Sequence, residues 1–91
     1  MKRRARFVAQ GRVQGVAYRA SALDRAVQLG VAGWIRNLPN GAVEGTVEGE
    51  ATAVDSFLAW AQRGPAGARV DSLDVEDETV EGGLERFEIR R

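Results

Sequence analysis

The chain has 91 residues, of which 44% are hydrophobic and 29% are charged, and its formal net charge is zero. This length and composition predict one compact globular domain over residues 1–91. The balanced charge argues against nucleic acid or a membrane surface as a partner. Cysteine and histidine are both absent, which excludes disulfides, thiolate nucleophiles, and metal sites or general bases that use either residue.

The first predicted element is a strand over residues 4–13. Side chains alternate there between apolar and polar, with Ala5, Phe7 and Ala9 on one face and arginines among those on the other. Alternation with a period of two is typical of a strand that is buried on one side only.

The stretch from Gly11 to Arg19 links this strand to the next element. Gly15 can adopt a positive φ, and a tight loop that opens onto a helix N-terminus can present consecutive N–H groups to an anion. Arg19 adds a planar cation suited to phosphate oxygens. Two interpretations follow, a phosphate-binding loop or a plain turn with a surface arginine. The loop alone favours the plain turn, because a glycine-rich turn is a weak signal.

Residues 20–29 have helical spacing. The predicted apolar side includes Leu23, Ala26 and Val27, and Gly30 follows the last apolar residue as a C-cap. Arg19 would then lie at the start of the helix, where a cation opposes the helix dipole unless an anion is bound.

A strand over residues 31–38 and another over residues 42–49 are predicted to form a hairpin. The Pro39-Asn40-Gly41 sequence between them is turn chemistry. In the second of these strands the side chains divide between two faces: Val43 and Val47 on one, and Glu44, Thr46 and Glu48 on the other.

A second helix is predicted after this hairpin. Thr52 and Asp55 have the spacing of a capping-box variant, and Gly64-Pro65 ends the helix. Its apolar stripe has helical spacing and consists of Val54, Phe57, Leu58 and Ala61.

Two further strands complete the chain. Val70, Leu73 and Val75 mark a fourth strand of acidic character. We expect the acidic run 71–81 to be a charged strand edge that resists pairing. After a Gly82-Gly83 turn, Phe87 and Ile89 alternate with charged residues in a short last strand.

The resulting order is β-α-β-β-α-β plus a terminal strand, which predicts an α+β fold of the ferredoxin-like type. In this sandwich both helices cover one face of an antiparallel sheet of order 4-1-3-2 and leave the other face wetter. The first two strands run in the same direction. Arg19 lies in the loop after the first strand, and Asn37 lies near the end of the second. We therefore expect both residues at the same end of the sheet.

Three glutamates, Glu44, Glu48 and Glu50, share one strand face and raise the alternative of a metal site. A solvated face is the favoured interpretation, because oxygen-ligand sites need several convergent groups. Trp34 and Trp60 are interpreted as packing residues.

The chain resembles the acylphosphatase family in two motifs, Gly11-Arg12-Val13-Gln14-Gly15-Val16-Ala17-Tyr18-Arg19 and Gly30-Val31-Ala32-Gly33-Trp34-Ile35-Arg36-Asn37-Leu38. The resemblance implies hydrolysis of acyl phosphates to a carboxylate and inorganic phosphate, without metal or cofactor. Arg19 would bind the phosphoryl group and Asn37 would orient the attacking water. The implied phosphate-binding set is the loop N–H groups of Gln14, Gly15, Val16, Ala17, Tyr18 and Arg19. Tyr18 is also expected to pack beside the loop.

We therefore expect a monomeric, cytoplasmic acylphosphatase that acts on a small molecule. No apolar run typical of a signal peptide or a membrane span is present. The alternative is a catalytically idle ferredoxin-like module that binds an anion or a partner protein. An RNA-binding domain is disfavoured, because the aromatic pattern of ferredoxin-like RNA binders is missing.

Overall fold

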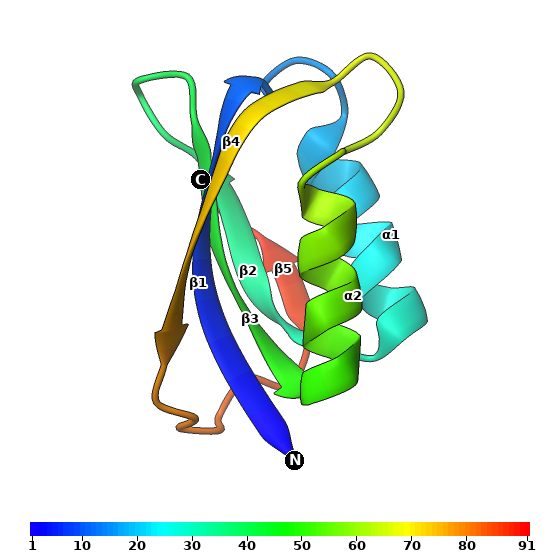
Figure 1. Cartoon of the computed structure of the whole chain (residues 1–91), viewed down its shortest axis with the longest axis vertical. Coiled ribbons are helices and arrows are strands. Elements are labelled where there is room, and N and C mark those ends of the chain that lie inside the picture. The colour runs from blue at the N-terminus through cyan, green and yellow to red at the C-terminus, as the bar shows by residue number, and fades with distance from the viewer.

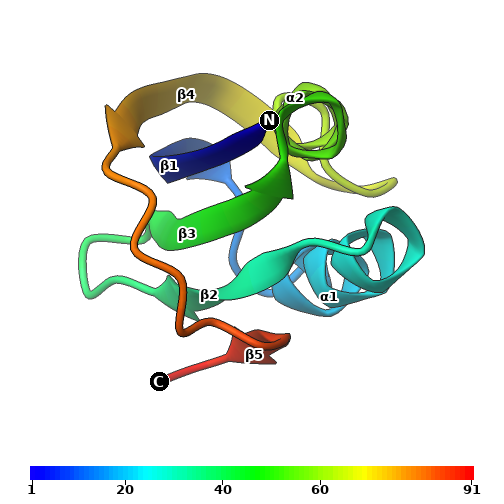
Figure 2. The same ribbon diagram turned by 90° about the horizontal axis from the view of Figure 1, so that it is seen from below.

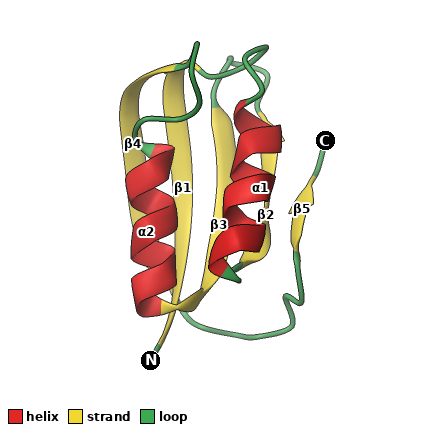
Figure 3. Cartoon of the chain, turned by 90° about the vertical axis from the view of Figure 1, so that its right-hand side faces the viewer, coloured by secondary structure: helices red, strands yellow, loops and turns green.

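The computed structural model describes residues 1–91 and forms a five-stranded sheet with both helices on one face (Figures 1 and 3). Chain order gives β1 (Lys2–Arg12), α1 (Tyr18–Leu29), β2 (Ala32–Asn37), β3 (Val43–Glu50), α2 (Ala51–Ala61), β4 (Arg69–Glu78) and β5 (Phe87–Ile89). The strands lie in the order β4-β1-β3-β2-β5, which Figure 2 shows from below. The predicted fold class and strand order are confirmed.

Strand directions decide where the loops meet. β1 and β2 each pair antiparallel with β3, so they run parallel to each other and finish at the same end of the sheet. β4 pairs antiparallel with β1, whereas β5 pairs parallel with β2. The four main strands thus form the predicted antiparallel sheet, and the terminal strand makes the whole sheet mixed.

The core lies between the sheet and the helices. The alternation in β1 is confirmed, because Ala5, Phe7 and Ala9 are fully buried beneath the helices. The apolar stripe of α2 is confirmed as well, and Phe57 lies at the centre of an aromatic cluster, with its ring centroid 5.6 Å from that of Phe7. Trp60 is buried in the same cluster, as expected of a packing residue.

The predicted buried side of α1 is confirmed at Ala26 and, in part, at Leu23, but it is wrong at Val27. Its buried residues are Tyr18, Ala22 and Ala26, whereas Val27 is 72% exposed. The helix begins earlier than predicted, at Tyr18, and this large side chain sets which face turns inward. The predicted C-cap at Gly30 is confirmed, with a φ of 71°.

The predicted capping box of α2 is wrong. The N-cap is Glu50, and no side chain caps the helix. β3 runs into α2 without an intervening loop, so Thr52 already lies inside the helix. The Glu50 carboxylate accepts a hydrogen bond of 3.1 Å from the terminal ammonium of Met1 instead of one from the helix backbone.

The hairpin between β2 and β3 has the predicted turn. Leu38 N–H donates to the Ala42 carbonyl at 2.8 Å, and Gly41 N–H donates back to the Leu38 carbonyl at 3.2 Å. The Asn40 side chain accepts a bond from Ala42 N–H at 3.0 Å, which is the local turn bonding that asparagine favours.

The face of the sheet opposite the helices is less wet than predicted. Glu44 and Glu48 are only 5% and 7% exposed. Arginines of neighbouring strands cover them: Arg6 and Arg36 donate to Glu44 at 2.7 and 2.6 Å. Arg4 lies 3.5 Å from Glu48. Burial raises the pKa of Glu44, but the hydrogen bonds from the two arginines outweigh burial and leave that pKa below its ordinary value.

Candidate active site

The loop between β1 and α1 has an unusual backbone. Gly15 adopts a φ of 75°, as predicted, and Ala17, the N-cap of α1, adopts φ 62° and ψ 24°. Ala17 is the only non-glycine residue of the chain with a positive φ. Left-handed residues within a short loop turn successive N–H groups toward one side, which is the geometry of an anion-binding nest. Backbone strain of this kind is characteristic of functional loops.

The N–H groups of this loop are free to bind a ligand. None of those from Gln14 to Arg19 donates a hydrogen bond within the protein, and no side chain caps α1. The first turn of a helix carries unsatisfied donors and the positive end of the helix dipole. The loop therefore presents the partial positive charge and the donors that a phosphate group needs.

Arg19 lies in the first turn of α1 and is half-buried. It takes part in none of the ion pairs of the protein. A partly buried guanidinium next to the positive end of a helix dipole is unfavourable without an anion. Its planar fork of donors fits phosphate oxygens.

Asn37 is the last residue of β2 and lies at the same end of the sheet as the β1–α1 loop. Arg19 and Asn37 line the same cavity, which has a volume of about 210 Å³. Their expected placement at one end of the sheet is confirmed. The lining of the cavity consists of Val13, Gly15, Ala17, Tyr18, Arg19, Ala20, Asn37 and Ile89.

The Asn37 side chain has an unsatisfied acceptor. Its Oδ1 atom is buried and has no hydrogen-bond partner in the protein. Such a group costs free energy in the unliganded fold and calls for an explanation. Asn37 and Arg19 line the same cavity, and a carboxamide oxygen is able to accept a hydrogen bond from a water molecule.

Tyr18 supports the loop rather than the chemistry. The ring is buried against Trp60, with the centroids 5.4 Å apart, and the hydroxyl donates to the Ala61 carbonyl at 2.7 Å. Burial raises the pKa of this phenol well above its ordinary value, so the side chain stays neutral. The expectation that Tyr18 packs beside the loop is confirmed.

Two predicted loop residues do not line the cavity with their side chains. Val16 packs partly buried against the core. The Gln14 side chain turns away and donates to the Leu38 and Ala42 carbonyls of the hairpin. Sequence reasoning missed this contact, and it missed Ile89 as a wall of the cavity, because neither partner is near in the sequence. The signal for Gln14 was a carboxamide within a glycine-rich loop, a residue type able to bridge two carbonyls.

Acidic clusters offer no alternative centre. No three His, Cys, Asp or Glu side chains gather closely enough to hold a metal ion. Glu44, which raised that alternative, is occupied by two guanidinium groups.

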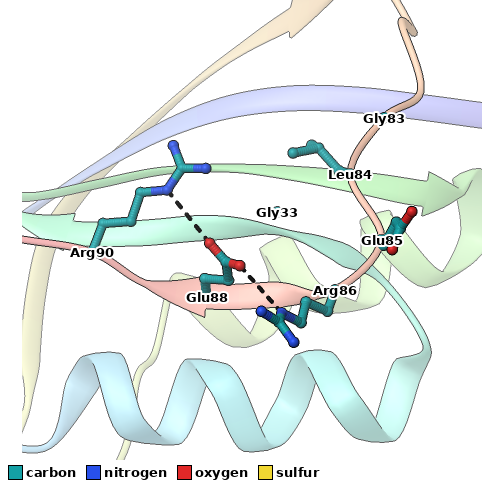
Figure 4. A pocket seen from close by; sticks show the side chains of 7 residues that line it. All are labelled: Gly33, Gly83, Leu84, Glu85, Arg86, Glu88 and Arg90. Atoms are coloured by element: carbon teal, nitrogen blue, oxygen red, sulfur yellow. Dashed lines mark hydrogen bonds and ion pairs between the residues drawn. The ribbon is translucent and has the colours of Figure 1, made fainter.

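A larger cavity of about 320 Å³ lies along β5 and contains neither Arg19 nor Asn37. Figure 4 shows that Glu88 lies between Arg86 and Arg90 there, with nitrogen–oxygen distances of 3.2 and 3.8 Å. These three charges pair with one another and are exposed, whereas Glu85, which also lines the cavity, makes no ion pair. A third cavity, about 410 Å³, includes Glu48 and Leu84 in its lining and also lacks both predicted residues.

Comparison with known proteins identifies close relatives. The family model described as Acylphosphatase matches residues 5–89. The acylphosphatase of Anaeromyxobacter dehalogenans is 55% identical over 87 residues, which cover 96% of this chain and 94% of that protein. The acylphosphatase of Rubrobacter xylanophilus is 51% identical over 88 residues, which cover 97% and 80%. The crystal structure of acylphosphatase from Bacillus subtilis superposes with a TM-score of 0.94 at 32% identity, covering all of both chains.

Proposed function

The chain belongs to the acylphosphatase family and hydrolyses acyl phosphates, and from this premise we propose that Arg19 binds the phosphoryl group while Asn37 orients the attacking water. The observation that carries the proposal is the single cavity lined by both side chains and by the β1–α1 loop. The free N–H groups of Gln14, Gly15, Val16, Ala17, Tyr18 and Arg19 surround the phosphoryl oxygens together with the Arg19 guanidinium.

The reaction needs little from the protein beyond positioning and charge stabilisation. Water attacks phosphorus in line with the bond to the carboxyl oxygen, that bond breaks, and the carboxylate leaves with the bonding electrons. Since a carboxylate is a weak base, the leaving oxygen needs no proton. The Asn37 Oδ1 accepts a hydrogen bond from the water, and this bond orients a lone pair of the water oxygen toward phosphorus. The water proton passes to a phosphoryl oxygen, which yields inorganic phosphate and requires no histidine.

Kinetics of two variants test these roles. Hydrolysis of benzoyl phosphate is measured with a chelator present and inorganic phosphate as competitor. Arg19→Ala is expected to lose about 10²–10³-fold or more in kcat/KM, because a charged group on the developing phosphoryl charge is removed. Asn37→Ala is expected to lose a similar factor in kcat while the inhibition constant of phosphate changes little.

Arg25→Ala is the matched control, because Arg25 is also a half-buried arginine on α1. This control should retain wild-type turnover. If a folded Arg19→Ala or Asn37→Ala variant also keeps it, the role assigned to that residue is wrong. Phosphate binding without turnover in the wild-type chain would support the idle anion-binding module instead.

We also propose that the protein acts as a cytoplasmic monomer. Both sheet edges discourage pairing: β5 has only three residues, and β4 carries a dense set of acidic side chains. Neither helix has the length and apolar character to cross a bilayer. Light scattering is expected to give the monomer mass of 9.9 kDa, and a doubled mass at micromolar concentration would contradict the proposal.

A further inference from the structure

Gln14 joins the phosphate-binding loop to the β2–β3 hairpin. Its Nε2 amide donates two hydrogen bonds, to the Leu38 carbonyl at 2.8 Å and to the Ala42 carbonyl at 2.9 Å. Leu38 follows Asn37 directly, and Leu38 and Ala42 are paired with each other across the hairpin. The loop and the hairpin both lie at the upper end of the sheet in Figure 1. One side chain therefore bonds both sides of the hairpin turn just beyond Asn37.

This contact is the only polar link between residues 13–16 and the rest of the fold. Residues 13–16 neither donate nor accept a backbone–backbone hydrogen bond, and no other side chain bonds to them. Apart from the Gln14 hydrogen bonds, residues 13–16 are held only by the apolar packing of Val13 and Val16. Both hydrogens of the Gln14 amide are used, so the plane of its carboxamide is fixed relative to the two carbonyls.

We propose that Gln14 is a positioning residue that sets the distance between the phosphate-binding loop and Asn37. This inference rests on the proposed function, in which the loop holds phosphorus and Asn37 holds the water. In-line attack depends on the relative position of these two groups, and a misplacement of about 1 Å can cost about 10²-fold in rate. The Gln14 side chain acts on that geometry without touching the substrate.

The Gln14→Met variant tests the inference, because it keeps the length and volume of the side chain and removes both donors. The Leu38 and Ala42 carbonyls keep their backbone partners, so the fold is expected to persist. The expected result is a fall in kcat of about 10- to 100-fold. The inhibition constant of inorganic phosphate should change by less than about threefold, because its ligands all belong to the loop and α1.

A double-mutant cycle separates this role from a general structural one. In an Asn37→Ala background, Gln14→Met should change kcat by less than about twofold, because no oriented water is left to misplace. Gln28→Met, an exposed glutamine without hydrogen bonds on α1, is the control and should behave as wild type. If Gln14→Met fails to fold, Gln14→Asn, whose amide is one methylene too short to reach the hairpin, replaces it in the same cycle.

Three outcomes overturn the inference. They are unchanged kcat in Gln14→Met, an equal loss in both backgrounds, or a loss of phosphate affinity as large as the loss of kcat. If Asn37→Ala loses turnover and Gln14→Met does not, only the inference fails. If Asn37→Ala itself retains wild-type turnover, the proposed role of Asn37 fails, and the inference fails with it.

Discussion

Two single-methyl changes in the β1–α1 loop, Ala17→Gly and Gly15→Ala, should shift the stability of the protein in opposite directions. Ala17 is left-handed, and a Cβ atom in that conformation costs about 1–2 kcal/mol. Ala17→Gly removes this strain and loses little packing, because Ala17 is exposed. Glycine adds about 0.4–1 kcal/mol of conformational entropy to the unfolded chain. The net expectation is a gain of about 0.5–1 kcal/mol, or about 2–8 °C in Tm for a domain of this size.

Gly15→Ala is the opposite change. A Cβ atom at Gly15 would meet nothing within 4 Å, so the cost comes only from the φ of 75°. A loss of about 0.5–1 kcal/mol is expected after the unfolded-state gain is counted. Thermal and urea unfolding followed by circular dichroism measure both variants and the double variant, which should be close to wild type. A less stable Ala17→Gly variant, or a Gly15→Ala variant as stable as wild type, would refute the reasoning about this backbone.

The remaining predictions concern the support around the site and the sheet. Tyr18→Phe removes the bond to the Ala61 carbonyl and should lower the free energy of unfolding by about 1–2 kcal/mol in urea titrations, with kcat unchanged; an equally stable variant would contradict this. Gly45→Ala would place a Cβ 2.5 Å from the Phe7 ring and should cost about 3 kcal/mol or more, so a normal Tm would be inconsistent with the close packing there. The folded-state pKa of Glu44 lies below its ordinary value of 4.5. Its stabilisation should therefore be complete above that value and lost as the pH falls through the lower folded-state pKa. Glu44→Gln should flatten the fall of the urea midpoint as the pH drops below 4.5, and an unaltered slope would argue against the buried ion pairs.

Much of the fold follows from local patterns in the sequence. The alternation in β1, the Asn40-Gly41 turn and the stripe of α2 each depend on residues that are close in the chain. Once these elements are known, the ferredoxin-like order brings the ends of β1 and β2 together. Arg19 and Asn37 could thus be placed at one end of the sheet from the sequence alone, although their roles came from a resemblance to a family.

The differences from the predictions have long-range causes. Val27 was expected to be buried, but the orientation of α1 depends on the packing of Tyr18 against α2. Glu44 was expected to face solvent, but arginines from both neighbouring strands cover it. The Gln14 contact spans 24 and 28 residues, and no local pattern encodes such a distance.

A crystal structure with inorganic phosphate bound tests the central claim most directly. The account predicts the anion in the cavity between α1 and β2, with its oxygens accepting bonds from the free loop N–H groups and from the Arg19 guanidinium. A further oxygen or water should lie within hydrogen-bond distance of Asn37 Oδ1. A phosphate ion bound elsewhere, with this cavity holding only solvent and Arg19 turned away from Asn37, would contradict the account.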